Sequence, residues 1–147
     1  MDAYLIDWLN LLVRWLHFIA GVAWIGSSFY FIWLDDHLQA PVNPDDDAKG
    51  VGGEVWSVHG GGIYHAQKYR VAPSKLPNHL HWFKWEAYTT WVSGIFLLAL
   101  VYWYGAEIYL LPGDGALSAP AAIGIAIAYI VGGWFIYDLL CRSPLAR

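Results

Sequence analysis

The first long apolar run of the chain, residues 5–34, carries polar and small side chains at helical spacing. They recur every three or four residues, which places them along one side of a helix with 3.6 residues per turn. The members of this stripe are Asp7, Asn10, Arg14, His17, Gly21, Trp24 and Ser28. Because an ionisable group at the centre of a bilayer costs about 3 kcal/mol by insertion scales, we expect the stripe to face a protein interior, a cavity or a cofactor.

Composition is typical of an integral membrane protein. Hydrophobic residues make up 58% of the chain and charged residues only 14%, against roughly 25% charged residues in soluble domains. Ten Trp and ten Tyr fit the aromatic belts found at membrane interfaces. The Lys and Arg residues are scattered, which argues against nucleic acid as a partner. The single Cys excludes an internal disulfide.

Three apolar runs are long enough to cross a membrane, namely residues 5–34, 82–111 and 119–140, and a polar loop fills residues 35–81. We predict an all-α fold: an integral membrane helical bundle of three transmembrane helices with a long Gly/His-rich loop, all within one membrane domain, 1–147. Three helices make a thin bundle around a polar stripe. We therefore expect the chain to be a fragment of a longer multi-span protein or a subunit of an oligomer.

Basic residues predict the orientation of the spans. They gather in the loop and at the start of the second run, as Lys49, Lys68, Arg70, Lys75 and Lys84, and the connector after the second run has none. By the positive-inside rule the N-terminus lies outside, and the long loop and the C-terminal end are cytoplasmic.

Glycines and aromatic residues in the loop argue against disorder. We expect a short strand or ribbon around residues 54–58 and a second short element after Ile63. A long loop of this kind inside a compact protein is typically functional or disordered. Here its content favours a function.

His17 lies about three turns into the first run, one turn after Arg14. A neutral imidazole in an apolar interior is a ready axial ligand for haem iron. The neighbouring guanidinium could pair with a haem propionate or with an anionic substrate. The alternative is a hydrogen-bonded His at a helix interface.

The sharpest local motif is HGGGIYH at residues 59–65. Three glycines allow the backbone to approach a flat ligand or to adopt positive φ angles, and His59 and His65 could ligate a metal or transfer protons. Gln67, Tyr69 and Arg70 follow, and amide and guanidinium groups suit a planar oxo-purine. The alternative is a Gly-rich turn with interfacial His and Tyr.

His79 and His81 precede Trp82 at the start of the second run. Alternating His residues could chelate Zn or Cu from an extended segment, but not from one helix face. An aromatic and charged anchor at the membrane interface is the alternative interpretation.

Five segments together carry a resemblance to a known family: residues 14–30, 49–54, 59–69, 81–88 and 137–144. They resemble the N-terminal membrane region of the bacterial membrane-bound urate oxidase (urate hydroxylase) that is linked to cytochrome c. The first run alone also resembles, more weakly, that of membrane protoporphyrinogen oxidases and of copper-resistance membrane proteins. In the former group the matching His is thought to hold haem b, which favours His17 as an axial ligand.

The resemblance implies an oxidoreductase of the bacterial inner membrane that converts urate to 5-hydroxyisourate and passes electrons to a c-type cytochrome. In that family further spans and a C-terminal cytochrome c domain follow, and this chain has no Cys-x-x-Cys-His haem attachment motif. A b-type haem is then expected in the membrane and a c-type haem in the missing domain.

These expectations give each candidate residue a role. The catalytic candidates are His59, His65 and Tyr64; the substrate-binding candidates are Gln67, Arg70 and Tyr69; the cofactor-binding candidates are His17, Arg14, Trp24 and His81; and the metal-ligand candidates are His17, His59 and His65. A homo-oligomer is a further expected assembly. Two competing functions are a metal-handling membrane module built on His59, His65, His79 and His81, and a structural subunit whose stripe only packs against partner helices.

Overall fold

The computed structural model describes residues 3–111, 113 and 115–144. The chain divides into two compact units, one formed by residues 1–18 and 89–147 and the other by residues 19–88. Helices α1 (Ala3–Asp36) and α3 (Lys84–Leu97) each contribute residues to both units.

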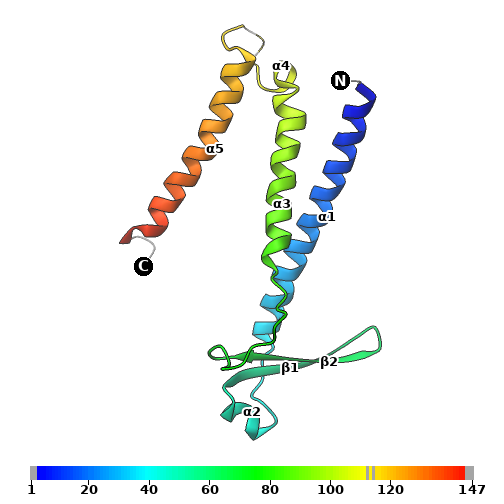
Figure 1. Cartoon of the computed structure of the whole chain (residues 1–147), viewed down its shortest axis with the longest axis vertical. Coiled ribbons are helices and arrows are strands. Elements are labelled where there is room, and N and C mark those ends of the chain that lie inside the picture. Colours follow the sequence, from blue (N-terminus) through cyan, green and yellow to red (C-terminus); the bar gives the residue numbers. More distant parts are fainter. Residues whose placement is uncertain (1–2, 112, 114, 145–147) are drawn as a thin grey trace. The chain divides into compact units, whose positions relative to one another are not determined.

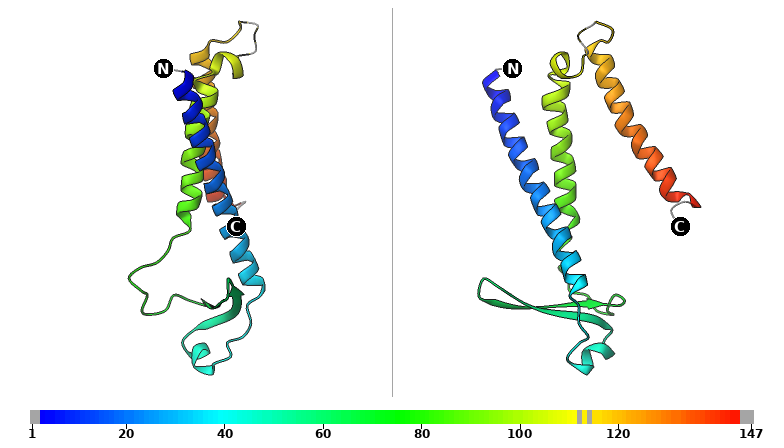
Figure 2. Two further views of the ribbon diagram at one scale, coloured as in Figure 1. Left: turned by 90° about the vertical axis from the view of Figure 1, so that its right-hand side faces the viewer. Right: turned by 180° about the vertical axis from the view of Figure 1, so that it is seen from behind.

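The first unit is helical. It contains the first half of α1, most of α3, a π-helical segment η1 (Leu98–Trp103), the short helix α4 (Ala106–Tyr109) and helix α5 (Ala119–Arg142). The α1 and α3 helices lie side by side in all three views of Figures 1 and 2. This pairing positions His17, one member of the polar stripe of α1, against α3.

The prediction of one unbroken helix over residues 82–111 was wrong. The α-helical hydrogen bonding of α3 ends at Leu97 and changes to a wider π-helical pattern, in which the Tyr104 amide donates to the Ala99 carbonyl at 2.9 Å. Gly105 then separates this segment from α4. Since an inserted π turn often marks a functional site, the break bears on the site described below.

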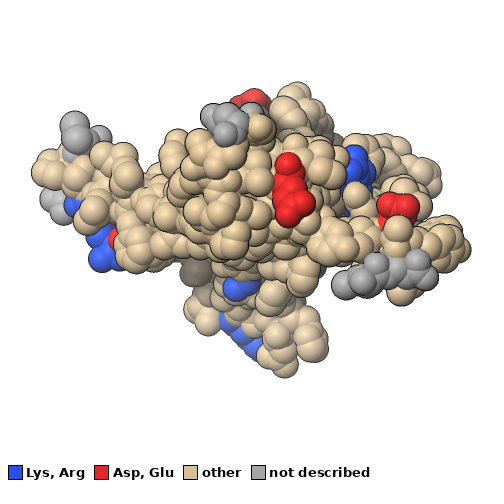
Figure 3. All heavy atoms as spheres, turned by 90° about the horizontal axis from the view of Figure 1, so that it is seen from above, with Lys and Arg blue, Asp and Glu red and all other residues tan. Residues whose placement is uncertain are grey.

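Only α1 and α5, among the described residues, are long and apolar enough to cross a membrane. They coincide with the apolar runs 5–34 and 119–140 to within two residues at each end. Most of their side chains are exposed, and charged side chains are sparse on the face drawn in Figure 3. Large apolar side chains without cover within the chain need cover from lipid or from other helices.

The second unit contains a β-hairpin, which contradicts the all-α fold class. Strands β1 (Val51–His59) and β2 (Gly62–Tyr69) pair antiparallel, and His59 pairs with Gly62 across a two-residue turn. The prediction of a strand around residues 54–58 and an element after Ile63 is confirmed. A mixed fold replaces the predicted three-span bundle, because two strands occupy the loop and, within the described residues, two helices are long and apolar enough to span.

Glycine chemistry explains the hairpin turn. Gly60 and Gly61 have φ angles of +57° and +80°, and positive φ at both central positions is what a type I′ two-residue hairpin loop requires. The three glycines therefore form the turn that the alternative interpretation of the HGGGIYH motif described.

The hairpin is anchored on short elements that follow α1. Val51 and Val55 on β1 are buried together with Leu34 of α1. Gln39 pairs with Glu54 through two backbone hydrogen bonds of 3.0 and 2.9 Å, which extends the sheet by one bridge. The short helix α2 (Pro44–Ala48) begins after Asn43, whose side chain accepts from the Asp45 amide. These contacts hold the residues on one face of the hairpin in place.

Candidate functional site

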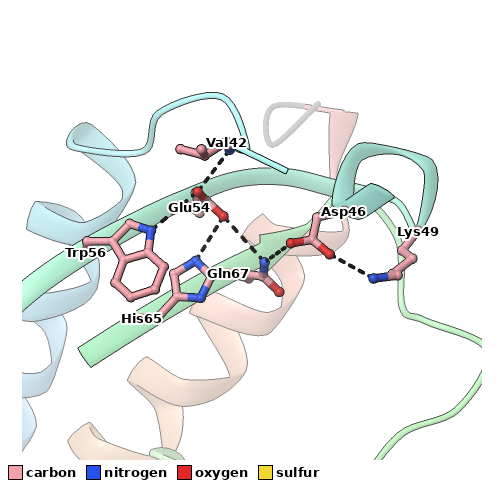
Figure 4. A network of polar contacts seen from close by, with 7 residues as sticks. All are labelled: Val42, Asp46, Lys49, Glu54, Trp56, His65 and Gln67. Atoms are coloured by element: carbon pink, nitrogen blue, oxygen red, sulfur yellow. Dashed lines mark hydrogen bonds and ion pairs between the residues drawn. The ribbon is translucent and has the colours of Figure 1, made fainter. Parts of the chain in front are cut away.

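A buried carboxylate, Glu54, lies at the centre of the second unit and is only 4% exposed. Its Oε1 accepts from the Val42 amide at 3.0 Å and from Trp56 Nε1 at 3.4 Å. Its Oε2 lies 2.9 Å from His65 Nε2 and accepts from Gln67 Nε2 at 3.4 Å (Figure 4). Both carboxylate oxygens are thus committed to donors on the protein.

These donors keep Glu54 ionised. The Val42 amide, followed by the side chains of His65, Gln67 and Trp56, lowers the pKa of Glu54 from 4.5 to about 2, while burial opposes the shift. Hydrogen bonds to a carboxylate favour its charged form. Glu54 therefore acts as a fixed negative charge and acceptor at every pH near neutrality.

The network continues from the hairpin to α2. Gln67 Nε2 also donates to Asp46 Oδ2 at 3.0 Å, and Lys49 Nζ pairs with Asp46 Oδ1 at 2.9 Å. The Lys49 ammonium, followed by the Gln67 amide, lowers the pKa of the Asp46 carboxyl, and Asp46 in turn raises the pKa of Lys49. Because both hydrogens of the Gln67 amide are directed to carboxylates, Gln67 serves as a bridge inside the protein.

The Trp56 ring stacks on one face of His65. The two rings are nearly parallel, with centroids 4.0 Å apart and planes inclined by 9°. Trp56 also lines a cavity of about 200 Å³ together with Trp33, His37 and Glu54. One face of the imidazole is therefore covered, and the His65 side chain stays partly accessible.

The structure does not bring His59 and His65 together. Side chains alternate between the two faces of a strand, and the register pairs His65 with Trp56 and His59 with Gly62. His65 therefore shares a face with Glu54 and Trp56, whereas His59 and Tyr64 lie on the opposite face. Across the described residues, no group of three or more His, Cys, Asp or Glu is arranged to hold a metal ion.

Two predicted substrate ligands lie at the base of the hairpin. Tyr69 pairs with Val51 beyond a bulge in β1, and Arg70 follows β2. The Arg70 guanidinium makes an ion pair with Asp47 of α2. Lys68, which was not a candidate, pairs with Asp35 at 2.8 Å. The cationic side chains of this region are thus paired with carboxylates of neighbouring elements.

His17 lies in the first unit and contacts α3. Its Nδ1 is 3.0 Å from the Thr90 carbonyl oxygen and 3.1 Å from Ser93 Oγ. The Ser93 hydroxyl donates to the Thr89 carbonyl at 2.6 Å, so its oxygen is an acceptor toward His17. A carbonyl can only accept. Nδ1 therefore carries the ring hydrogen, and the lone pair of the neutral imidazole is on Nε2.

A hollow of about 350 Å³ adjoins His17 in the same unit. The residues that line it are Arg14, His17, Gly94, Leu97, Leu98, Val101 and Tyr102, so the π-helical segment forms part of its wall. A Cβ added at Gly94 would lie 3.2 Å from Cε1 of His17. Gly94 therefore allows the imidazole to approach the α3 backbone closely. The volume falls within the range of about 300–1,000 Å³ that small-molecule sites occupy.

Arg14 lines this hollow without an ionic partner among the residues that the structure describes. Its guanidinium donates to Asn10 Oδ1 at 3.1 and 3.4 Å, and Asn10 is neutral. The positive charge of Arg14 is thus oriented by the preceding turn of α1 and remains available to an anion.

The remaining candidates lie in the second unit. Trp24 accepts hydrogen bonds from Ser27 and Ser28 at its carbonyl and lines a small hollow on α1. His81 lies before α3, with Nε2 at 3.3 Å from Glu86 Oε1 and its ring edge-on to Phe83. His17 is the only histidine of the first unit.

Comparison with known proteins identifies the family. A family model described as urate oxidase N-terminal matches residues 3–147. The chain belongs to this urate oxidase N-terminal family. No curated protein and no solved structure matches it. The match confirms the coarser part of the resemblance seen in the sequence, a relation to urate oxidases and hence to oxidoreductases. It covers both units described above.

Sequence reasoning missed the partners of the two central histidines in this member of the urate oxidase N-terminal family. Glu54 was not a candidate, although alternation along β1 and β2 would have placed it on the face of His65. Thr90 and Ser93 were also missed, because they lie 73 and 76 residues from His17. No local pattern in the sequence marks such distant pairs.

Proposed function

We propose that the chain is the membrane module of a urate-oxidising system that converts urate to 5-hydroxyisourate and passes electrons to a c-type cytochrome. The observation that carries this proposal is the match of the urate oxidase N-terminal family model over residues 3–147. The described side chains add two histidines, each with one ring nitrogen held by a protein acceptor. Such pre-oriented imidazoles suit ligand binding and proton transfer.

His17 fits an axial ligand of a b-type haem. Metal-ligating His residues usually donate the other ring N–H to a carbonyl or carboxylate, which fixes the tautomer. The contact of Nδ1 with the Thr90 carbonyl follows that pattern. A b-type haem, when bound, supplies one-electron chemistry. His17 would hold the iron through Nε2, and Arg14 would pair with a propionate or with an anionic substrate.

We propose that membrane lipid covers the exposed apolar side chains of α1 and α5. α1 and α5 are long and apolar enough to span, and only 6% of the residues in an apolar 18-residue stretch of each are buried within the chain. The segment between α1 and α3 contains Lys49, Lys68 and Lys75, so the positive-inside rule favours its cytoplasmic placement. Urate would then be taken from the cytoplasmic side.

The test is urate turnover by membranes. The protein, as its gene encodes it, is expressed in a bacterium without any other urate oxidase, and urate loss is followed together with reduction of a c-type cytochrome. We expect two electrons to reach the cytochrome for each urate consumed. Urate loss that is coupled to hydrogen peroxide instead, or no urate loss at all, would contradict the proposal.

A further inference from the structure

We propose that Glu54 is a positioning residue that holds the imidazole of His65 in the tautomer whose free Nδ1 accepts a proton during urate oxidation. This inference rests on the proposed function for the identity of the reaction. The geometry of the pair does not depend on it. It assigns a role to a carboxylate that no motif marks, and it selects one nitrogen of one histidine as the base.

The contact with Glu54 decides the tautomer of His65. Nε2 lies 2.9 Å from Glu54 Oε2, and an ionised carboxylate can only accept hydrogen bonds. Nε2 must therefore carry a hydrogen. In the neutral ring the lone pair is then on Nδ1. In the described part of the chain no hydrogen bond to Nδ1 is found, and no dashed line reaches that atom in Figure 4.

Glu54 is itself held so that it cannot turn away. The Val42 amide donates to Oε1 at 3.0 Å, and the backbone of Glu54 pairs with Gln39 on the other side of β1. The carboxylate is buried, and the bonds it accepts keep it charged. A fixed anion beside Nε2 stabilises the positive charge that His65 gains when Nδ1 takes a proton.

The Trp56 ring restricts the orientation of the His65 imidazole. It lies 4.0 Å from the His65 ring and nearly parallel to it, so the imidazole cannot rotate out of its plane without losing the stack. Nδ1 is therefore presented in one direction, along the edge of the ring that is not held by Glu54.

No other candidate for a base combines these features. His81 also lies near a carboxylate, with Nε2 3.3 Å from Glu86 Oε1, but Phe83 meets its ring edge-on and does not cover it. His59 lies at the turn on the opposite face, and no carboxylate contact is recorded for it in the described residues. His17 has its hydrogen on Nδ1 and lies in the other unit. Among the histidines, His65 is the one that combines a charged acceptor, a covering ring and partial exposure.

The proton balance of the reaction requires a base. Urate and one water give 5-hydroxyisourate, two protons and two electrons. The water oxygen forms the new C–O bond, and both hydrogens that are lost leave as protons. The electrons pass to the c-type cytochrome of the proposed function. One of the protons goes to Nδ1 of His65 and then to solvent. A correctly placed base of this kind contributes about 10²–10⁴-fold to a rate.

The first test needs no substrate. The full protein, labelled with ¹⁵N at histidine and held in lipid nanodiscs, is studied by NMR at a pH where His65 is neutral, and the His65 signals are assigned by their loss in His65→Gln. We expect a protonated Nε2 and an unprotonated Nδ1. In Asp35→Asn, which removes an exposed carboxylate outside the network, the two shifts should stay unchanged. In Glu54→Gln they should move toward each other as both tautomers become populated.

The second test separates positioning from folding by kinetics. His65→Gln retains an N–H that can donate to Glu54 but removes the base, so the hairpin should fold and kcat should fall about 100-fold with KM for urate little changed. Glu54→Gln should lower kcat in the same way, whereas Asp35→Asn, which removes an exposed carboxylate outside this network, should leave kcat within about twofold of wild type.

Two results would overturn the inference. One is a wild-type His65 whose hydrogen is on Nδ1, which can be read without any variant and without turnover. The other is a His65→Gln protein that turns over urate at the wild-type rate. Since the NMR signature needs no urate, a protein that shows the expected tautomer but oxidises no urate would contradict the proposed function while leaving the Glu54–His65 geometry intact.

Discussion

At the scale of single residues, two histidines of this protein are oriented in the same way, by a hydrogen bond from one ring nitrogen to a protein acceptor. His17 directs Nδ1 to the Thr90 carbonyl, and His65 directs Nε2 to the Glu54 carboxylate. In each ring one nitrogen is committed and the other is left as a Lewis base. The difference lies in the acceptor. The charged carboxylate beside His65 stabilises the positive charge of a ring that gains a proton more than the neutral carbonyl beside His17 can.

Gly94→Ala should disturb His17 without removing it. The new methyl group would lie 3.2 Å from Cε1 of His17, so the ring must shift by a few tenths of an ångström and its hydrogen bonds to α3 must lengthen. We expect a lower content of bound haem per protein, measured by visible absorbance against protein concentration. Gly26→Ala is the matched control, since nothing lies within 4 Å of a Cβ at that position. Equal haem content in both variants would contradict the packing described here.

Acid should unfold the hairpin through Glu54. The hydrogen bonds that Glu54 accepts lower its pKa from 4.5 to about 2, so the stability that it contributes is present above pH 4.5 and is lost as the pH falls through this range toward 2. Amide hydrogen exchange of β1 and β2 should accelerate as the pH is lowered through that window, after correction for the intrinsic rates. In Glu54→Gln this dependence should flatten. An equally steep dependence in the variant would show that another group is responsible.

At the scale of secondary-structure elements, the hairpin and the π-helical segment each position one site. The alternation of β1 and β2 puts Glu54, Trp56 and His65 on one face. The π-helical segment η1 supplies Leu98, Val101 and Tyr102 to the wall of the hollow beside His17. The π-helical segment departs from the regular helix that the apolar run 82–111 predicts. Departures of this kind are often found at functional sites.

Substitution of Gly60 should test the turn that fixes the register of the hairpin. Its φ of +57° is left-handed, which Asn tolerates and a β-branched residue does not. Gly60→Val should destabilise the hairpin by about 1–2 kcal/mol, whereas Gly60→Asn should cost much less. Urea unfolding followed by hydrogen exchange of β2 measures both. A Val variant as stable as the Asn variant would contradict the assigned turn.

At the scale of the whole molecule, hydrophobic length predicted two helices well and one poorly. The runs 5–34 and 119–140 form α1 and α5 because both are long and apolar, and because no glycine within them interrupts the α-helical hydrogen bonding. The run 82–111 has a similar apolar content, but a change of hydrogen-bond register at Leu98 leaves α3 with 14 residues. Composition does not report such a change.

The candidate site was only partly predictable, because the sequence marks single residues and not their contacts in the fold. His17 and His65 were found because an imidazole in an apolar run or beside a Gly-rich turn is locally conspicuous. Their partners were not found, since Glu54 requires the strand register and Thr90 requires the pairing of α1 with α3. The all-α prediction failed because the loop was expected to contain only short elements, while β1 and β2 have nine and eight residues.

The most direct measurement of the proposed redox role is the visible absorption spectrum of the purified full protein in detergent, recorded with and without urate under anaerobic conditions. We expect a b-type haem signal, distinct from any c-type haem, that is reduced by urate. It should be lost in His17→Ala and retained in His37→Ala, a substitution of an exposed histidine that directly follows helix α1. A wild-type protein without b-type absorbance, or a His17→Ala protein that retains it in full, would contradict the assignment of His17 as the axial ligand.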